Sequence, residues 1–281
     1  MIVSASYRTD VPAFQAHWFA ERLARGWVET PNPYGGKPTL IRLDAAHADG
    51  FVFWTRNVAP FFGVLDGLKA ERRPFVVTYT LTGYPRALDP RPPRAEVAIA
   101  QIRALSQRFG RDSVVWRYDP IVETTLTPQD WRRSTFADLA QALSTSVDEV
   151  CVSWASIYRK TRRNLDRAAT EHGFAWRDPD DDEKRATLRD LAAIAADCGL
   201  RMTLCSQPTL TVDGVAPAAC IDAERLSRVA GYAINAKRKP NRPGCLCAES
   251  RDIGRYDNCA HGCAYCYAVR NHDAALKTND A

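Results

Sequence analysis

The chain has 281 residues, of which 46% are hydrophobic and 25% are charged. This composition excludes an intrinsically disordered chain and provides enough apolar residues for one large core or two smaller ones. The first residues contain no basic leader followed by an apolar stretch, and no run of about eighteen apolar residues occurs, so we expect a cytoplasmic protein without a membrane span. The net charge of +5 permits a phosphate-bearing partner without requiring one.

Six short apolar segments, rich in β-branched and aromatic residues, are separated by helix-length intervals. Nearly continuous apolar runs of this kind are typical of parallel strands that are buried on both faces. The predicted strands are residues 2–7, 51–56, 74–81, 113–118, 149–154 and 201–206. Strands that alternate with helices predict an α/β fold with a parallel sheet.

Five amphipathic segments between these strands have the period of helices, and several of them end at a glycine suited to a C-cap. They span residues 13–26, 59–71, 94–110, 128–144 and 182–199. Residues 38–44 are extended but lie too close to the strand at 51 for an intervening helix, so we expect a peripheral ribbon there. No repeat or linker divides residues 1–230, which we predict to form one domain.

Polar side chains lie at the carboxyl ends of most predicted strands. Parallel α/β sheets place their functional sites at that edge, so we expect these side chains to line a common cavity. They are Arg8, Asp10, Arg56, Asn57, Tyr79, Thr82, Arg117, Tyr118 and Asp119. The alternative is that strand ends are polar only because they meet water and neighbouring loops.

The chain contains nine cysteines. Disulfides are rare in a reducing compartment and the number is odd, so metal binding or catalysis explains an organised set better than disulfides do. Five of the nine lie in residues 231–281, which are basic, rich in proline and glycine, and poor in periodic apolar residues. We predict a separate Cys-rich metal-binding segment there.

Three of these cysteines, Cys259, Cys263 and Cys266, have the spacing C-x3-C-x2-C. Three thiolates on a tight turn can face one metal centre and leave its fourth position open. A structural zinc site requires a fourth protein ligand, and His261 or His272 is available for that role. The spacing alone leaves both kinds of site open.

Four further cysteines predict a possible second site, which would hold an auxiliary iron–sulfur cluster or a zinc ion. They are Cys205, Cys220, Cys245 and Cys247. The alternative is that the first two are small buried hydrophobic side chains, as free cysteines commonly are. Cys151 and Cys198 have no cysteine nearby in the sequence, and we expect both to pack in the core.

Other features predict ordinary structure. Residues 32–36 predict a Pro/Gly turn, and residues 177–184 predict a solvated turn followed by the acidic first turn of a helix. The basic residues of 158–164 and 235–242 predict solubilising surfaces rather than a nucleic-acid groove.

Tyr265 directly precedes the last cysteine of the string "CAHGCAYCYA" (residues 259–268). The cysteine spacing with this aromatic residue resembles the motif of the radical S-adenosylmethionine (SAM) enzymes, and the longer string is closest to the spore photoproduct lyase-like branch of that superfamily. From "SASYRTDVP" near its start to these cysteines, the chain also resembles an uncharacterised bacterial domain family with a C-terminal radical-SAM-like cysteine cluster.

The resemblance implies a partial (β/α)6 TIM-like barrel, with a [4Fe-4S] cluster on the three cysteines and SAM on the fourth iron. In that superfamily the cluster loop follows the first strand, whereas here it follows the last predicted strand, so the order is permuted. If the loop folds back over the strand ends, Cys263 lies at the same edge as Arg8, Arg56 and Asp119.

The resemblance also implies an enzyme that generates a 5′-deoxyadenosyl radical and abstracts hydrogen from a small-molecule or nucleotide-like substrate, with a ferredoxin or flavodoxin as electron donor. The residues expected to bind SAM are Tyr265, Arg8, Arg56 and Asn57. The residues expected to act on the substrate are Arg117, Tyr118 and Asp119, with Tyr118 or Cys205 as a hydrogen-atom relay. One alternative is a non-catalytic zinc or iron–sulfur protein that binds nucleic acid or a protein partner. Another is an isomerase or hydrolase that uses the strand-end Arg and Asp residues.

Overall fold

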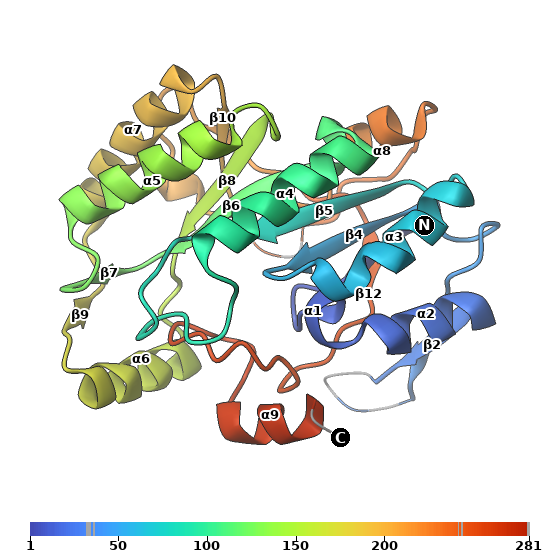
Figure 1. The fold of residues 1–281 in the computed structure, drawn as a ribbon, viewed down its shortest axis with the longest axis horizontal. Coiled ribbons are helices and arrows are strands. Elements are labelled where there is room, and N and C mark those ends of the chain that lie inside the picture. Colours follow the sequence, from blue (N-terminus) through green and yellow to red (C-terminus); the bar gives the residue numbers. More distant parts are fainter. Residues whose placement is uncertain (32–34, 36, 241, 243, 280–281) are drawn as a thin grey trace.

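The computed structural model describes residues 1–31, 35, 37–240, 242 and 244–279, so the turn predicted at 32–36 lies largely outside the described residues. Eight parallel strands form the central sheet (Figure 1). Their spatial order is β11 (Ala216–Pro217), β10 (Arg201–Leu204), β8 (Glu149–Trp154), β6 (Val114–Ile121), β5 (Phe75–Thr80), β4 (Gly50–Thr55), β1 (Ile2–Ala5) and β12 (Ser250–Asp252).

All six predicted strands are confirmed, and they are neighbours in chain order from β1 to β10. The pairing is parallel throughout, with Val3 opposite Phe51 and Val52 opposite Val76. The two edge strands, β11 and β12, are too short to show an apolar run. Both were absent from the prediction.

The five predicted helical segments are confirmed, although the first is interrupted at Gln15, and the described residues contain three further helices. The helices are α1 (Val11–Phe14), α2 (Ala16–Arg25), α3 (Phe62–Ala70), α4 (Ala95–Phe109), α5 (Gln129–Leu143), α6 (Arg159–His172), α7 (Asp181–Asp197), α8 (Ala223–Ala230) and α9 (His272–Asn279). Short 3-10 turns are η1 (Ala59–Phe61), η2 (Arg111–Ser113) and η3 (Pro208–Leu210). The acidic run begins α7, where Asp180 and Glu183 form a capping box, as the charge pattern predicted.

Two small antiparallel ribbons lie outside the main sheet. The first pairs β2 (Trp27–Thr30) with β3 (Thr39–Arg42), which confirms the peripheral ribbon. The second pairs β7 (Glu123–Thr124) with β9 (Trp176–Arg177). None of the described helices has both the length and the apolar character needed to cross a bilayer.

Alternation along the strands gives the sheet two different faces. One face, which includes Phe51, Phe53 and Trp116, packs against helices in the larger core. The opposite face, which we call the inner face, includes Val52 and Val115 and packs against α8 and the described part of residues 218–248. Most helices therefore cover one face, and the C-terminal part of the chain covers the other.

The sheet stays open, so the expected TIM-like barrel is corrected to an open α/β sheet. Strands β11 and β12 are its edges, and no ladder joins them over the residues that the structure describes. Closure would require hydrogen bonds between these edges. The described part of residues 218–248 covers the inner face instead, and the chain then adds β12 to the sheet beside β1.

Candidate functional site

The C-terminal cysteines lie on a loop that begins directly after β12, and we call residues 253–268 the cysteine loop. Ser4 of β1 pairs with Asp252 of β12. The Asp252 carboxylate accepts hydrogen bonds from Ser4 Oγ at 2.7 Å, Ser6 Oγ at 2.9 Å and Gly254 N at 2.9 Å. Because parallel strands end at the same edge, this pairing brings the cysteine loop to the carboxyl edge of the sheet.

Gly254 makes this approach possible, since a Cβ there would lie 1.8 Å from Ser6 Oγ. We therefore predict that Gly254→Ala lowers the free energy of unfolding by about 1–3 kcal/mol through overpacking. The control is Gly63→Ala in α3, where a Cβ meets no atom within 4 Å and should add about 0.5–1 kcal/mol. Urea unfolding measures both variants, and a Gly254→Ala variant as stable as wild type would contradict the close packing.

Arg56, at the end of β4, joins the cysteine loop to the sheet. Its Nη1 donates to Cys263 Sγ at 3.2 Å and to Asp89 Oδ1 at 2.9 Å, and its Nη2 donates to Thr82 Oγ1 at 3.0 Å. Tyr265 OH donates to Asp89 at 2.7 Å and also contacts the guanidinium. Burial lowers the pKa of Arg56, but the Asp89 carboxylate and other nearby groups raise it by more. The pKa of Arg56 therefore lies well above its ordinary value. Arg56 is thus a charged donor to the Cys263 sulfur.

Asp10 holds His261, the residue midway between the first two loop cysteines. Its carboxylate accepts from Ala13 N at 2.9 Å, from Arg56 N at 2.7 Å and from His261 Nε2 at 2.7 Å. The His261 ring also packs edge-on against Phe14. Its Nδ1 is buried and has no hydrogen-bond partner among the described residues. One nitrogen of this candidate zinc ligand is therefore already engaged.

Contacts from three further parts of the fold fix the cysteine loop. Tyr267 OH donates to the carbonyl of Tyr7, which follows β1, at 2.8 Å. Asn164 of α6 donates to the carbonyl of Cys266 at 2.9 Å, and Leu88, in the loop after β5, accepts from Ala264 N at 2.9 Å. The loop, drawn in red in Figure 1, is therefore docked on the carboxyl edge and on α6.

Of the three loop cysteines, Cys263 is buried, and Cys259 and Cys266 are partly buried. Burial raises the pKa of Cys259 to about 12 and also raises the pKa values of Cys263 and Cys266. Their three sulfurs are not all within 4.8 Å of one another. Among the described Cys, His, Asp and Glu residues, a different set of three has its ligand atoms that close together. The loop cysteines are thus near one another without the close spacing that a single ion imposes.

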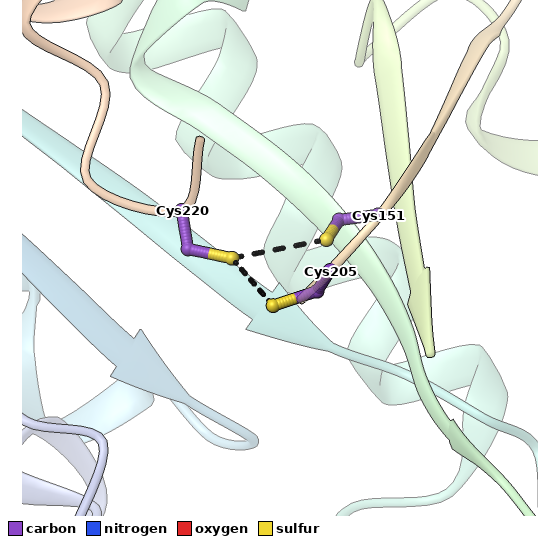
Figure 2. A group of neighbouring side chains, drawn as sticks. All are labelled: Cys151, Cys205 and Cys220. Atoms are coloured by element: carbon purple, nitrogen blue, oxygen red, sulfur yellow. Dashed lines mark hydrogen bonds between the residues drawn. The ribbon is translucent and has the colours of Figure 1, made fainter. Parts of the chain in front are cut away.

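That other set, which we call the inner cysteine group, consists of Cys151, Cys205 and Cys220 (Figure 2). The sulfur of Cys220 lies 3.9 Å from that of Cys151 and 3.3 Å from that of Cys205. Cys205 and Cys220 were predicted for a second site, whereas Cys151 was predicted to pack in the core. Cys151 packs in the core of the inner face, as predicted, and strand alternation also places its sulfur opposite the segment that carries Cys220.

The other two cysteines of the predicted second site lie close by. Cys247 N donates to Cys245 Sγ at 3.4 Å, and the N–H of Ile221, the residue after Cys220, donates to Cys247 Sγ at 3.4 Å. Cys198 caps α7 and packs against the helix-covered core, which confirms the prediction for that residue.

Arg117 and Asp119 of β6 lie beside the inner cysteine group. Arg117 Nη1 donates to Cys220 Sγ at 3.0 Å and to Cys151 Sγ at 3.4 Å, and its Nη2 pairs with Asp119. Hydrogen bonds from Cys151, then from Cys205 and Cys247, together with the Arg117 charge lower the pKa of Cys220 well below its ordinary value despite burial. Ser153 donates to Asp119.

The structure separates two residues from the predicted set. Tyr118 lies on the opposite face from Arg117, packs against Trp116 and Phe136, and is fully buried in the helix-covered core. Asn57 also faces the helices, because its Oδ1 accepts from Gln101 Nε2 at 2.9 Å. Neither side chain lies with the loop cysteines.

Arg8 remains near the cysteine loop. Its Nε lies 3.8 Å from Asp252 Oδ1, and its guanidinium carbon lies 5.1 Å from the ring centre of Tyr256. Both partners belong to the last part of the chain, so the structure brings Arg8 and Arg56 to the same loop. Asp119, which was also predicted to lie at the same edge as Cys263, is related to the loop only by its charge, which adds to the effect of burial in raising the pKa of Tyr267.

Sequence reasoning missed two carboxylates of this site, Asp89 and Asp252. Asp89 follows a turn after β5 in "ALDPRPP", and no apolar run marks its position. Asp252 ends the three-residue strand β12. The proline-rich context of Asp89 predicts only a turn, and the partners of both residues are distant in the sequence.

His272, the other candidate zinc ligand, is buried at the start of α9, and neither ring nitrogen has a hydrogen-bond partner among the described residues. Burial, followed by the charges of Arg167 and Arg91, lowers its pKa to about 4. The unfolded state therefore binds more protons below a pH of about 6.5, and stability should fall as the pH drops from there toward about 4.

We predict that, between pH 7 and pH 4.5, the free energy of unfolding falls by about 1–3 kcal/mol less in His272→Gln than in wild type. Unfolding curves at the two pH values measure the difference. His17→Gln is the control, since its side chain is exposed. An unchanged pH dependence in His272→Gln would contradict the buried neutral imidazole.

A cavity of about 390 Å3 borders the ion pair of Arg56 and Asp89. Thr82, Tyr84 and the first residues of α4 also line it. Its volume lies in the range of small-molecule sites. The carboxyl edge therefore combines buried thiols, a charged donor to sulfur and an adjacent space for a ligand.

Together these features define an open parallel α/β protein with two groups of cysteines, one on a loop at the carboxyl edge of the sheet and one on its inner face. Over residues 2–268 the chain matches the family described as Domain of unknown function (DUF1848), and it belongs to that family. The expected membership in an uncharacterised domain family is confirmed. Neither the curated proteins nor the solved structures gave a match.

Proposed function

We propose that this protein is a radical SAM-type enzyme in which Cys259, Cys263 and Cys266 hold a [4Fe-4S] cluster. The observation that carries the proposal is the position of β12 beside β1. The cysteine loop follows the last strand in sequence, but that strand adjoins the first strand in space. The loop thus follows β12, which lies next to the first strand of the sheet, and the resemblance to radical SAM enzymes requires a cluster loop near that strand.

The strand order supports the partial-barrel architecture that the resemblance implies. From β12 the row continues through β1, β4, β5, β6, β8 and β10 in chain order. Sequential parallel strands with helices on one face are the repeating unit of (β/α) barrels. An open row of this kind would leave its carboxyl edge accessible to a cofactor and a substrate.

The donor set of the loop suits an iron–sulfur cluster. Each cysteine binds a different iron in a cubane cluster, so the sulfurs lie farther apart than they do around one ion. The three loop sulfurs do not all lie within 4.8 Å of one another, as three thiolate ligands of one zinc ion would. The Arg56 guanidinium, which donates to Cys263 Sγ, would offset negative charge on the bound sulfur.

When bound, the cluster would supply an electron to the sulfonium of SAM, releasing methionine and a 5′-deoxyadenosyl radical that abstracts hydrogen from the substrate. The residues of the chain would bind and orient the reactants. Arg56 and Asp89 line the cavity beside Tyr265, and that cavity would take the adenosine part of SAM or a small-molecule substrate. Arg8, next to Tyr256, would bind a carboxylate or phosphate group.

Asp119 would orient a polar group of a substrate from the adjoining part of the edge, and the buried Arg117 would act through its ion pair with Asp119. Their ion pair and the hydrogen bond from Ser153 fix both side chains. Asn57 and Tyr118 face the helices, so they would act only through the residues that they support. An electron donor such as a ferredoxin or flavodoxin would reduce the cluster.

The test is to reconstitute the protein anaerobically with iron and sulfide, reduce it with dithionite and incubate it with SAM. The proposal predicts 5′-deoxyadenosine and methionine in equal amounts, and none from Cys263→Ala. An intact cluster that gives neither product nor any binding of SAM would exclude the proposal. Stoichiometric zinc at the loop cysteines would favour the non-catalytic alternative.

A further inference from the structure

The inner cysteine group joins three separate parts of the chain. Cys151 comes from β8, Cys205 follows β10 and Cys220 follows β11 (Figure 2). Their three sulfurs lie within 4.8 Å of one another. We propose that these thiolates, with Cys247 as the fourth ligand, bind one structural Zn2+ ion. This site is independent of the proposed cluster on the cysteine loop.

The sulfur spacing suits a single tetrahedral ion. With Zn–S bonds of about 2.3 Å, tetrahedral geometry places neighbouring sulfurs about 3.8 Å apart. The observed separations from Cys220 Sγ are 3.9 Å to Cys151 and 3.3 Å to Cys205. Among these three sulfurs, zinc binding therefore requires a shift of only a few tenths of an ångström, whereas a cubane cluster would require them to separate.

Cys247 is the fourth cysteine beside this set, and its sulfur, which is not within 4.8 Å of all three others, would have to move closer to complete the tetrahedron. It is 3% exposed and lies close enough to Cys220 to contribute to the lowered pKa of that thiol. The backbone N–H of Ile221 donates to Cys247 Sγ at 3.4 Å, a type of hydrogen bond that supports a metal-bound thiolate. Each thiol that still carries a proton would release it when the ion binds.

Arg117 supplies positive charge next to these ligands. Four thiolates around Zn2+ leave a net charge of −2, which is costly to bury without a compensating cation. The Arg117 guanidinium is 5% exposed and donates to the sulfurs of Cys151 and Cys220. The same guanidinium pairs with Asp119, so it joins the sulfurs to a carboxylate.

Cys151 is buried and Cys205 and Cys220 are only partly exposed, which favours a structural over a catalytic site. The cavity that Arg117, Cys151 and Cys220 line has a volume of about 10 Å3. This space admits at most one water molecule, so no substrate can reach the sulfurs from it. The ion would join β8 and β10 to residues 218–248, the segment that covers the inner face and leads to β12.

The test is to purify the full chain anaerobically from zinc-supplemented medium and to measure zinc and iron per chain by mass spectrometry. We expect about one zinc ion per chain in wild type and a loss of about tenfold or more in Cys220→Ser. The matched control Cys198→Ser should keep its zinc. Cys263→Ala should lose iron but keep zinc, so this result is separable from failure of the proposed cluster.

Three results would each overturn the proposal. They are a wild-type protein without zinc, a Cys220→Ser variant that retains its zinc, and a Cys220→Ser variant that loses iron instead of zinc. A second measurement uses wild type only, in case Cys220→Ser does not fold. Cys205 and Cys220 should react with an alkylating agent much faster after a zinc chelator is added, whereas Cys198 should not change. Equal reactivity of Cys205 and Cys220 before and after chelation, or a disulfide between them in the anaerobic protein, would overturn it.

Discussion

Replacement of Cys263 by alanine is expected to remove the brown colour and most of the iron and acid-labile sulfide of the anaerobically purified protein. Iron should fall from about four atoms per chain to less than about one, because a [4Fe-4S] cluster on three cysteines does not survive the loss of one of them. Cys263 also accepts a hydrogen bond from buried Arg56, so its thiol lies at the point where the loop joins the sheet. Iron and sulfide assays with an absorption spectrum measure the effect.

Cys198→Ala is the matched control, because Cys198 is a half-buried cysteine at the end of α7 and belongs to neither cysteine group. It should keep its iron and its spectrum. If Cys263→Ala retained the full iron content of wild type, the loop cysteines would not be the cluster ligands.

Replacement of Arg56 by methionine is expected to lower the free energy of unfolding by about 3–5 kcal/mol, because it leaves the Asp89 carboxylate buried without its cation. The side chains of both residues are largely buried, and Asp89 also accepts from Thr82 at 2.9 Å. The loop should detach more easily as well, since Arg56 donates to Cys263. Urea unfolding measures stability, and the iron content reports the loop.

The double variant Arg56→Met/Asp89→Leu separates the lost ion pair from the lost packing. Removing both charges avoids an unpaired buried carboxylate, so this variant should regain much of the stability lost in Arg56→Met. Its iron content should stay below that of wild type, because the donor to Cys263 is still missing. If Arg56→Met unfolds at the same urea concentration as wild type, the ion pair contributes little to stability.

The sequence predicted most of the framework, because the framework is built from local patterns. Continuous apolar runs marked the six inner strands, and amphipathic periodicity marked the helices that cover one face. Strands β11 and β12 could not be predicted in this way, since two or three residues carry no period and their pairing depends on partners far along the chain.

The candidate site was predicted less completely than the fold. Spacing identified the loop cysteines, but Cys151 joins Cys205 and Cys220 only through strand pairing and the return of residues 218–248 across the inner face. Local sequence carries no information about such a meeting. The separation of Arg117 from Tyr118, by contrast, follows from alternation, because consecutive residues of a strand point to opposite faces.

The permuted position of the cysteine loop is also explained only in three dimensions. Residues 218–248 cross the inner face, and β12 then pairs with β1, so a loop late in the sequence reaches the edge of the first strand. The sequence indicates the motif and the structure indicates how it reaches its place.

The most direct test of the proposed function is the electron paramagnetic resonance spectrum of the reduced protein with and without SAM. A cluster held by Cys259, Cys263 and Cys266 has one iron without a protein thiolate, so the account predicts that SAM changes the shape and position of the reduced-cluster signal. The same change should occur in Cys198→Ala. A reduced, intact cluster whose spectrum stays identical in excess SAM would contradict the proposal that this loop is a radical SAM site.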